Sequence, residues 1–291
     1  MTRRLPGPAL VVLAASLFGT IGTARVLGPA APAAGVGALR MLGAGLLLAL
    51  LARRCPAESW RAEARRPHTL VAGLGQALFQ LTFLAAVVST GVAVGTLVAI
   101  GSAPLLAGLV SRRVSPAWAV ATAVSVCGLT LLVLEGGGAR LSATGVALAL
   151  GAGASYAGYT LATARALDDG AEPAVTAAVA FCLAGAVLLP ALAVTDLRWL
   201  ASASGLAMVA YLALVPTVLA YRIFTAGLRG IAPATASTLA LAEPVVATVL
   251  GVVVLGEQLG LLGWVGAALV LAGLVLAGRD AVSRHQERVP A

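Results

Sequence analysis

Residues 233–255 read PATASTLALAEPVVATVLGVVVL, a stretch whose only ionisable side chain is Glu243, directly before Pro244. A helix needs roughly 20 apolar residues to cross the hydrocarbon core of a bilayer. The stretch therefore predicts a membrane-spanning helix with a carboxyl group and a proline near its midpoint.

The whole chain has the same character. Hydrophobic residues make up 60% of its 291 residues and charged residues 10%, and the mean hydropathy is +1.01. A soluble domain carries about a quarter charged residues and could not cover so many apolar side chains. The composition excludes an ordinary soluble domain and places the chain in a lipid bilayer.

Ten apolar stretches of spanning length follow one another, separated by short joints that contain proline, glycine or charged residues. We therefore predict an all-α integral membrane protein with ten transmembrane helices. The predicted spans are residues 6–28, 31–52, 69–88, 91–110, 117–134, 143–165, 173–194, 203–227, 233–255 and 259–277.

The orientation of these spans follows from the basic residues, which are all arginines. Short cytoplasmic loops retain positive charge. With the N-terminus inside, most arginines fall in cytoplasmic segments, and only Arg25, Arg140 and Arg198 fall near the opposite face. We expect both termini to be cytoplasmic and the protein to be a multi-pass protein of the plasma (inner) membrane.

The two halves of the chain resemble each other when one is shifted by about 140 residues. Pro104 then falls on Pro244, and Ser16 falls on Ser155. Because each half has five spans, an odd number, the second copy must enter the membrane upside down. We predict two inverted five-helix repeats, residues 1–139 and 140–279, and a cytoplasmic tail over residues 280–291.

Several motifs resemble the drug/metabolite transporter superfamily in its ten-helix, EamA-type form. Leu17-Phe18-Gly19-Thr20 resembles the family's leucine-tryptophan-glycine opening, with Phe18 at the tryptophan position, and Arg40 lies where the family has an arginine in its second helix. Residues 232–237, 241–247 and 255–259 match the family's run through helices nine and ten. The resemblance implies a transporter of small organic molecules, mostly for efflux of metabolites or amino acids. It also implies a central cavity between helices one, three, four, six, eight and nine.

Ionisable side chains near the middle of a span are costly in lipid and are functional candidates. Glu243 lies there beside Pro244, whose ring removes a backbone donor and breaks the helix. We expect Glu243 to bind a substrate ammonium group or carry a coupling proton; the alternative is a structural carboxyl group that steadies the kinked helices. Arg40 lies at a similar depth and keeps its charge. We expect it to pair with Glu243 or to bind carbonyl ends of broken helices.

Polar and aromatic side chains at mid-depth outline the rest of a candidate substrate site. Gln76 and Gln80 lie four residues apart, as do Phe79 and Phe83, so amides and rings share neighbouring faces of one helix. Helix packing is the alternative explanation for all of these residues. Further candidates are Phe18, Ser155, Tyr156, Tyr159, Tyr211 and Thr217, with predicted helix kinks at Pro104, Pro216 and Pro244.

The alternative functions are a channel-like facilitative permease and an intramembrane enzyme. A channel needs a continuous ring of like polar groups, whereas an inverted repeat with midplane prolines favours alternating access. An enzyme that holds a magnesium diphosphate needs paired aspartate motifs, and Asp168-Asp169 is the only such pair. No cofactor or metal is expected, because the chain has no nucleotide-binding P-loop and its cysteines and histidines are scattered.

We predict a secondary transporter, without enzymatic activity, that exports a small organic metabolite or an amino acid by alternating access. Its expected partners are this small-molecule substrate and the lipid bilayer, and not nucleic acid, because the arginines do not line one polar face. The fifth and tenth spans have few polar side chains. We expect them to be peripheral and to offer a face for a homodimer.

Overall fold

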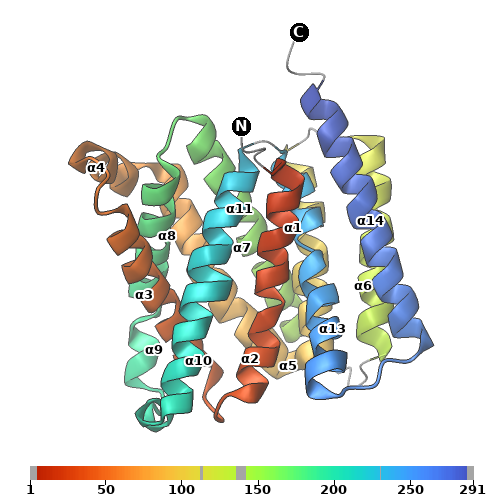
Figure 1. Cartoon of the computed structure of the whole chain (residues 1–291), viewed down its shortest axis with the longest axis horizontal. Coiled ribbons are helices and arrows are strands. Elements are labelled where there is room, and N and C mark those ends of the chain that lie inside the picture. Colours follow the sequence, from red (N-terminus) through yellow and green to blue (C-terminus); the bar gives the residue numbers. More distant parts are fainter. Residues whose placement is uncertain (1–4, 112–113, 136–141, 230, 287–291) are drawn as a thin grey trace.

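The computed structural model describes residues 5–111, 114–135, 142–229 and 231–286. Every regular element in these ranges is a helix, and the long helices form one bundle (Figure 1). Lipid offers no hydrogen bonds to the backbone, so an apolar segment must satisfy its peptide groups internally, as a helix does. The predicted all-α class is confirmed.

The first half of the chain contains α1 (Gly7–Phe18), α2 (Thr20–Leu27), α3 (Ala33–Ala52), α4 (Ala57–Arg65), α5 (Pro67–Ser111) and α6 (Pro116–Glu135). The second half begins with α7 (Ala143–Asp168), α8 (Pro173–Leu188), α9 (Pro190–Ala193) and the short 3-10 helix η1 (Arg198–Ala201). It continues with α10 (Ala203–Ala213), the π-helical turn η2 (Leu214–Leu219), α11 (Ala220–Leu228), α12 (Pro233–Leu239), α13 (Ala242–Leu255) and α14 (Leu261–Gln286).

Within the described residues, nine helical segments are long and apolar enough to cross a membrane. They agree with nine of the predicted spans to within a few residues. The remaining prediction, 143–165, forms α7, which has 26 residues but is not among the nine. Its many glycine, serine, threonine and tyrosine residues lower its hydropathy, and such residues are tolerated because much of α7 is buried against protein.

Glycine ends two helices where a left-handed backbone conformation is needed. Gly91 (φ 83°) interrupts α5, which otherwise runs through both the third and the fourth predicted spans. Gly256 (φ 72°) ends α13. A residue without a side chain adopts this conformation freely. The turn at Gly91 is a single residue, and the turn that begins at Gly256 reaches α14 within five residues.

The structure also differs from the predicted boundaries. Helix α4 lies in the segment between the second and third spans, which was expected to be a loop, and runs across the end of the bundle (Figure 1). Helix α14 extends to Gln286, beyond the predicted limits at 277 and 279. The predicted boundary between residues 139 and 140, and Arg140 itself, lie outside the described residues.

Small residues set the closest helix contacts. A side-chain carbon added to Gly128 of α6 would lie 2.6 Å from the Gly266 carbonyl oxygen of α14, and the reverse substitution would give the same distance. Helices α6 and α14 lie side by side at one edge of the bundle (Figure 1). Gly45 of α3 similarly contacts the α8 backbone, and Gly185 of α8 contacts Leu42 of α3. Such close approach is the usual way in which helices associate in lipid.

Candidate functional site

Two interrupted helices meet at Glu243. Helix α12 ends at Leu239 and α13 begins at Ala242, so Glu243 lies in the first turn of α13, where a helix N-terminus favours a negative charge. Helices α1 and α2 are separated at Gly19, and a side-chain carbon there would lie 2.7 Å from the Glu243 carbonyl oxygen. The break in one span is therefore packed directly on the break in the other.

Arg40 and Glu243 bring opposite charges to this region. Arg40 is buried in α3, whereas Glu243 lies deep among the helices but retains part of its accessible surface. The two charges interact electrostatically, and both also interact with Tyr221. The ion pairs found among the described residues do not include them, so their charged atoms are more than 4.0 Å apart. Each charge remains available to a third group.

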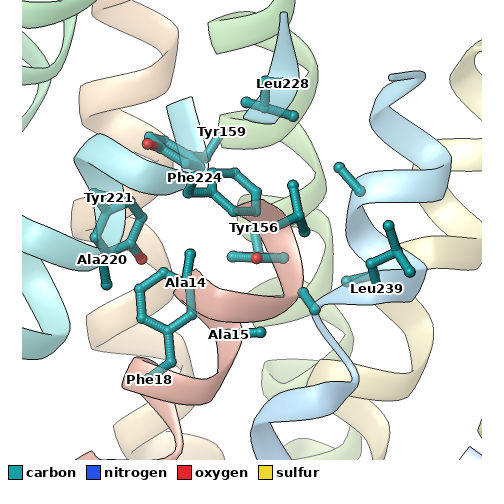
Figure 2. Close-up of a cluster of buried hydrophobic side chains, with 14 of the residues drawn as sticks. Ala14, Ala15, Phe18, Tyr156, Tyr159, Ala220, Tyr221, Phe224, Leu228 and Leu239 are labelled. Carbon is teal, nitrogen blue, oxygen red and sulfur yellow. The ribbon is translucent and has the colours of Figure 1, made fainter. Parts of the chain in front are cut away.

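Aromatic rings from three helices surround this point. Figure 2 shows the rings of Phe18, Tyr156, Tyr221 and Phe224, which come from α1, α7 and α11, facing one another. The Phe18 and Tyr221 ring centres are 4.8 Å apart, and those of Tyr156 and Phe224 are 6.5 Å apart. Aromatic pairs at this spacing attract each other beyond simple burial. The rings provide an apolar wall beside the charged groups.

The two phenylalanines of α5 extend this wall. The rings of Phe79 and Phe83 stack with centres 5.4 Å apart, and Phe79 lies 5.9 Å from Tyr156. Tyr159 lies 5.5 Å from Tyr221. The structure therefore joins five of the predicted aromatic residues to Tyr221 in one cluster that spans both halves of the chain: Phe18, Phe79, Phe83, Tyr156 and Tyr159.

Several buried polar atoms near these rings have no hydrogen-bond partner. They include the amide nitrogens of Gln76 and Gln80 and the hydroxyl of Tyr156. The Gln76 side chain also interacts with Tyr221. An unsatisfied buried donor costs free energy, so such groups usually have a water or a ligand as partner. Of these groups, the Tyr156 hydroxyl interacts electrostatically with Glu243.

Three predicted residues contribute less to the site. The Ser155 hydroxyl donates to the Gly151 carbonyl (2.8 Å) and the Thr217 hydroxyl donates to the Leu212 carbonyl (2.7 Å), so both are used within their own helices. Tyr211 is 37% exposed on α10 and is not one of the clustered rings. Thr217 instead satisfies a backbone carbonyl in the stretch that contains Pro216.

The predicted kink positions lie in different settings. Pro244 lies immediately after the break between α12 and α13, and Pro216 lies in η2, where the helix widens to a π-helical turn. Proline removes one backbone donor and commonly causes such irregularities. Pro104 lies inside the second part of α5, where the helix continues without a break.

Sequence reasoning missed two rings of the cluster. Phe181 of α8 lies 4.6 Å from Tyr221, and Phe224 lies 6.3 Å from it. Phe224 follows Tyr221 by three residues, and this spacing places two side chains on one helix face. That signal was present in the sequence. Nothing in the sequence of α8 indicates which of its faces meets α11.

Residues 143–279 match the EamA-like transporter family. The chain is 38% identical to an uncharacterized transporter, YwfM of Bacillus subtilis (strain 168), with 97% of this chain and 96% of the relative covered. It is 34% identical to the threonine/homoserine exporter RhtA of Escherichia coli (strain K12), with 88% and 85% covered. The chain belongs to the EamA-like transporter family.

The resemblance to drug/metabolite transporters is thereby confirmed, and this EamA-like transporter is a multi-pass membrane protein and not an enzyme. A crystal structure of a protein with 21% sequence identity superposes with a TM-score of 0.77, over 95% of this chain and 98% of the other. That likeness concerns the fold.

Proposed function

We propose that this EamA-like transporter exports a small zwitterionic amino acid by binding its two charged ends between Arg40 and Glu243. The observation that carries the proposal is the placement of these opposite charges close enough to interact and too far apart to pair. A buried charge without a direct partner is costly. A zwitterion with a carboxylate at Arg40 and an ammonium group at Glu243 would compensate both.

The surrounding groups suit the rest of such a molecule. Arginine binds a carboxylate through two parallel hydrogen bonds, and the free amide of Gln76 and the free hydroxyl of Tyr156 can add further bonds. The Phe18 and Tyr221 rings offer an apolar surface to the side chain. The relatives named as threonine/homoserine exporters support an amino acid of this size as the first compound to test.

We also propose the ten-span, inverted-repeat architecture, with α7 as the sixth span. In an inverted repeat, exchanging spans one to five with spans six to ten should convert each helix contact into another observed contact. Spans one and nine touch where Gly19 meets α13, and spans six and four touch where Gly153 of α7 meets Ala99 of α5. Spans one and eight are in contact (α1 and α11), as are spans six and three, where Gly75 meets Ser155.

Two further contacts fit the same exchange. Spans two and seven (α3 and α8) contact each other, as do spans five and ten (α6 and α14), and each of these pairs converts into itself. Two aromatic contacts are also related by this exchange. Phe18 and Tyr221 join spans one and eight, and Tyr156 and Phe79 join the equivalent spans six and three. This pattern supports two similar halves that rock about a shared central site.

The proposed location is the plasma (inner) membrane with both termini cytoplasmic, because most arginines then face the cytoplasm. Helix α1 begins and α14 ends at the same end of the bundle, as this orientation requires (Figure 1). Export as the direction of transport rests on the relatives.

Counterflow in proteoliposomes tests the proposal. Vesicles loaded with unlabelled threonine should accumulate labelled threonine transiently, because a carrier exchanges substrate on its two sides faster than it returns empty. A pH gradient applied in parallel separates proton-coupled from facilitated transport, since only a coupled carrier accumulates substrate in response to it. Absence of exchange for threonine and for a panel of other small amino acids would contradict the proposal. Flux that unlabelled substrate on the far side does not accelerate would indicate a channel.

A further inference from the structure

Helix α4 has two faces of different chemistry. It joins α3 to α5 and lies at one end of the bundle, beside the ends of the spanning helices (Figure 1). Glu63 on its inner face is only 2% exposed, and Trp60 packs partly against the main core. Successive helical residues are about 100° apart. Arg61 and Arg65, two residues on either side of Glu63, therefore lie on the opposite face.

A buried network fixes this orientation. One carboxylate oxygen of Glu63 accepts a hydrogen bond from Arg66 Nε (3.0 Å). The other accepts from the hydroxyls of Thr69 (2.7 Å) and Thr176 (3.1 Å), and Thr176 belongs to α8. Arg66 also donates to the Asp169 carbonyl after α7 (3.3 Å). The network binds α4 to both halves of the chain, so the helix cannot roll without breaking several buried bonds.

The outer side is strongly basic as a result. Arg53, Arg54, Arg61 and Arg65 are all exposed, and Glu58 is the one exposed acidic side chain within α4. Exposed Asp168, Asp169 and Glu172 lie at the Arg66 end of the helix. Among the described residues, the ion pairs do not involve any of these four arginines. The acidic side chain that could have neutralised one of them, Glu63, faces inward and is already paired with Arg66.

We propose that the exposed arginines of α4, Arg61 and Arg65, together with Arg53 and Arg54 in the turn between α3 and α4, bind the headgroups of anionic phospholipids. Positive charge complements an anionic headgroup, and the connection of α4 to two spanning helices holds these side chains at headgroup depth. Trp60 packs partly against the main core and helps to hold the same helix in place. The bound lipid is thus specified by the charge of its headgroup, and this binding is separate from the transport of a solute.

Native mass spectrometry of the full chain tests this binding without any transported solute. The protein in mild detergent is mixed with equal amounts of phosphatidylglycerol and phosphatidylcholine that have the same acyl chains. We expect phosphatidylglycerol to be retained preferentially. Each basic residue at an anionic surface contributes about fivefold to binding, so Arg61→Gln with Arg65→Gln should lower the affinity about 25-fold.

Two controls make the result specific. Arg198→Gln removes an exposed arginine from the segment between α9 and α10 and should leave retention unchanged; this arginine already pairs with Asp196 (2.7 Å). The double variant Arg61→Lys with Arg65→Lys keeps the charge and should retain the lipid, which separates a charge effect from misfolding.

Equal retention of both lipids, or unchanged retention in the glutamine double variant, would overturn the proposal. Complete displacement of the lipid by added inorganic phosphate would also overturn it, because the face would then be a site for free anions. Because transport is not measured, failure here leaves the proposed function untouched.

Discussion

Glu63 is the residue whose environment most directly predicts a stability effect. Its carboxylate accepts hydrogen bonds from Arg66, Thr69 and Thr176. Glu63→Ala leaves the Thr69 hydroxyl without its acceptor and removes the charged partner of Arg66, while Thr176 and Arg66 keep bonds to backbone carbonyls. We expect a loss of about 1–3 kcal/mol. Thermal unfolding in detergent should show this as a decrease of several degrees in the midpoint.

The matched control is Glu58→Ala, which removes an exposed carboxylate from the same helix. It should change the free energy of unfolding by no more than about 0.5 kcal/mol, so its midpoint should stay close to that of the parent. Glu63→Gln keeps an acceptor for the threonines but loses the charge opposite Arg66, so its midpoint should fall between those of the parent and the alanine variant. Equal midpoints for the variants at positions 63 and 58 would refute this account of the network.

At the level of the helices, the contact between the two interrupted spans should control the site. Gly19→Ala places a methyl carbon 2.7 Å from the Glu243 carbonyl oxygen, so α1 or α13 must shift. Because Glu243 lies in the first turn of α13, we expect at least a tenfold lower rate of threonine counterflow; displacements of about 1 Å commonly cost more than this.

Gly22→Ala provides the control for that experiment. A side-chain carbon at Gly22 meets nothing within 4 Å, although the residue lies only three positions away, in α2. Its counterflow rate should equal that of the parent. A normal rate in the Gly19 variant would mean that the two breaks are not coupled through this contact.

The crossing of α6 and α14 allows a similar paired test of packing. Gly266→Ala would place a carbon 2.6 Å from the Gly128 carbonyl oxygen, whereas Gly278→Ala in the same helix meets nothing within 4 Å. Overpacking of this kind costs about 1–3 kcal/mol. The first variant should unfold at a clearly lower temperature than the second, as followed by circular dichroism. Equal midpoints would show that the helices can separate at little cost.

The spans were predictable from the sequence because hydropathy depends only on local composition. Nine of them agree closely with the structure. Helix α4 was not predicted, because four of its nine residues are charged and it lies in a segment that contains further arginines and a proline. Most spanning helices are apolar on all sides, so the sequence does not show which face meets the protein. The inward placement of Phe181 and the outward placement of Tyr211 depend on tertiary packing.

The candidate site was predictable to a similar extent. Depth alone indicated Arg40 and Glu243, since charges in the middle of a span are rare. The direct Arg40–Glu243 pair remains a prediction. In the structure the two side chains interact electrostatically, but the ion pairs among the described residues do not include them. The separation depends on how α3 and α13 pack, which a single sequence cannot give.

For the molecule as a whole, the proposed substrate site and the proposed inverted repeat would belong to one mechanism. A site formed by α1, α3, α5, α7, α11 and α13 takes residues from both halves, so a relative rotation of the halves can expose it to one side at a time. The substrate would join the two charges during this change. Transport and recognition would then depend on the same pair of residues.

The most direct test is a counterflow measurement that combines variants with substrate analogues. Threonine is compared with threoninol, which lacks the carboxylate, and with 3-hydroxybutyrate, which lacks the ammonium group. We expect the parent protein to prefer threonine over each analogue by about 10- to 100-fold, the value of a charged hydrogen bond. Arg40→Gln should abolish the preference over threoninol, and Glu243→Gln the preference over 3-hydroxybutyrate. If both variants keep the parent's preferences, Arg40 and Glu243 do not bind the two ends of the substrate.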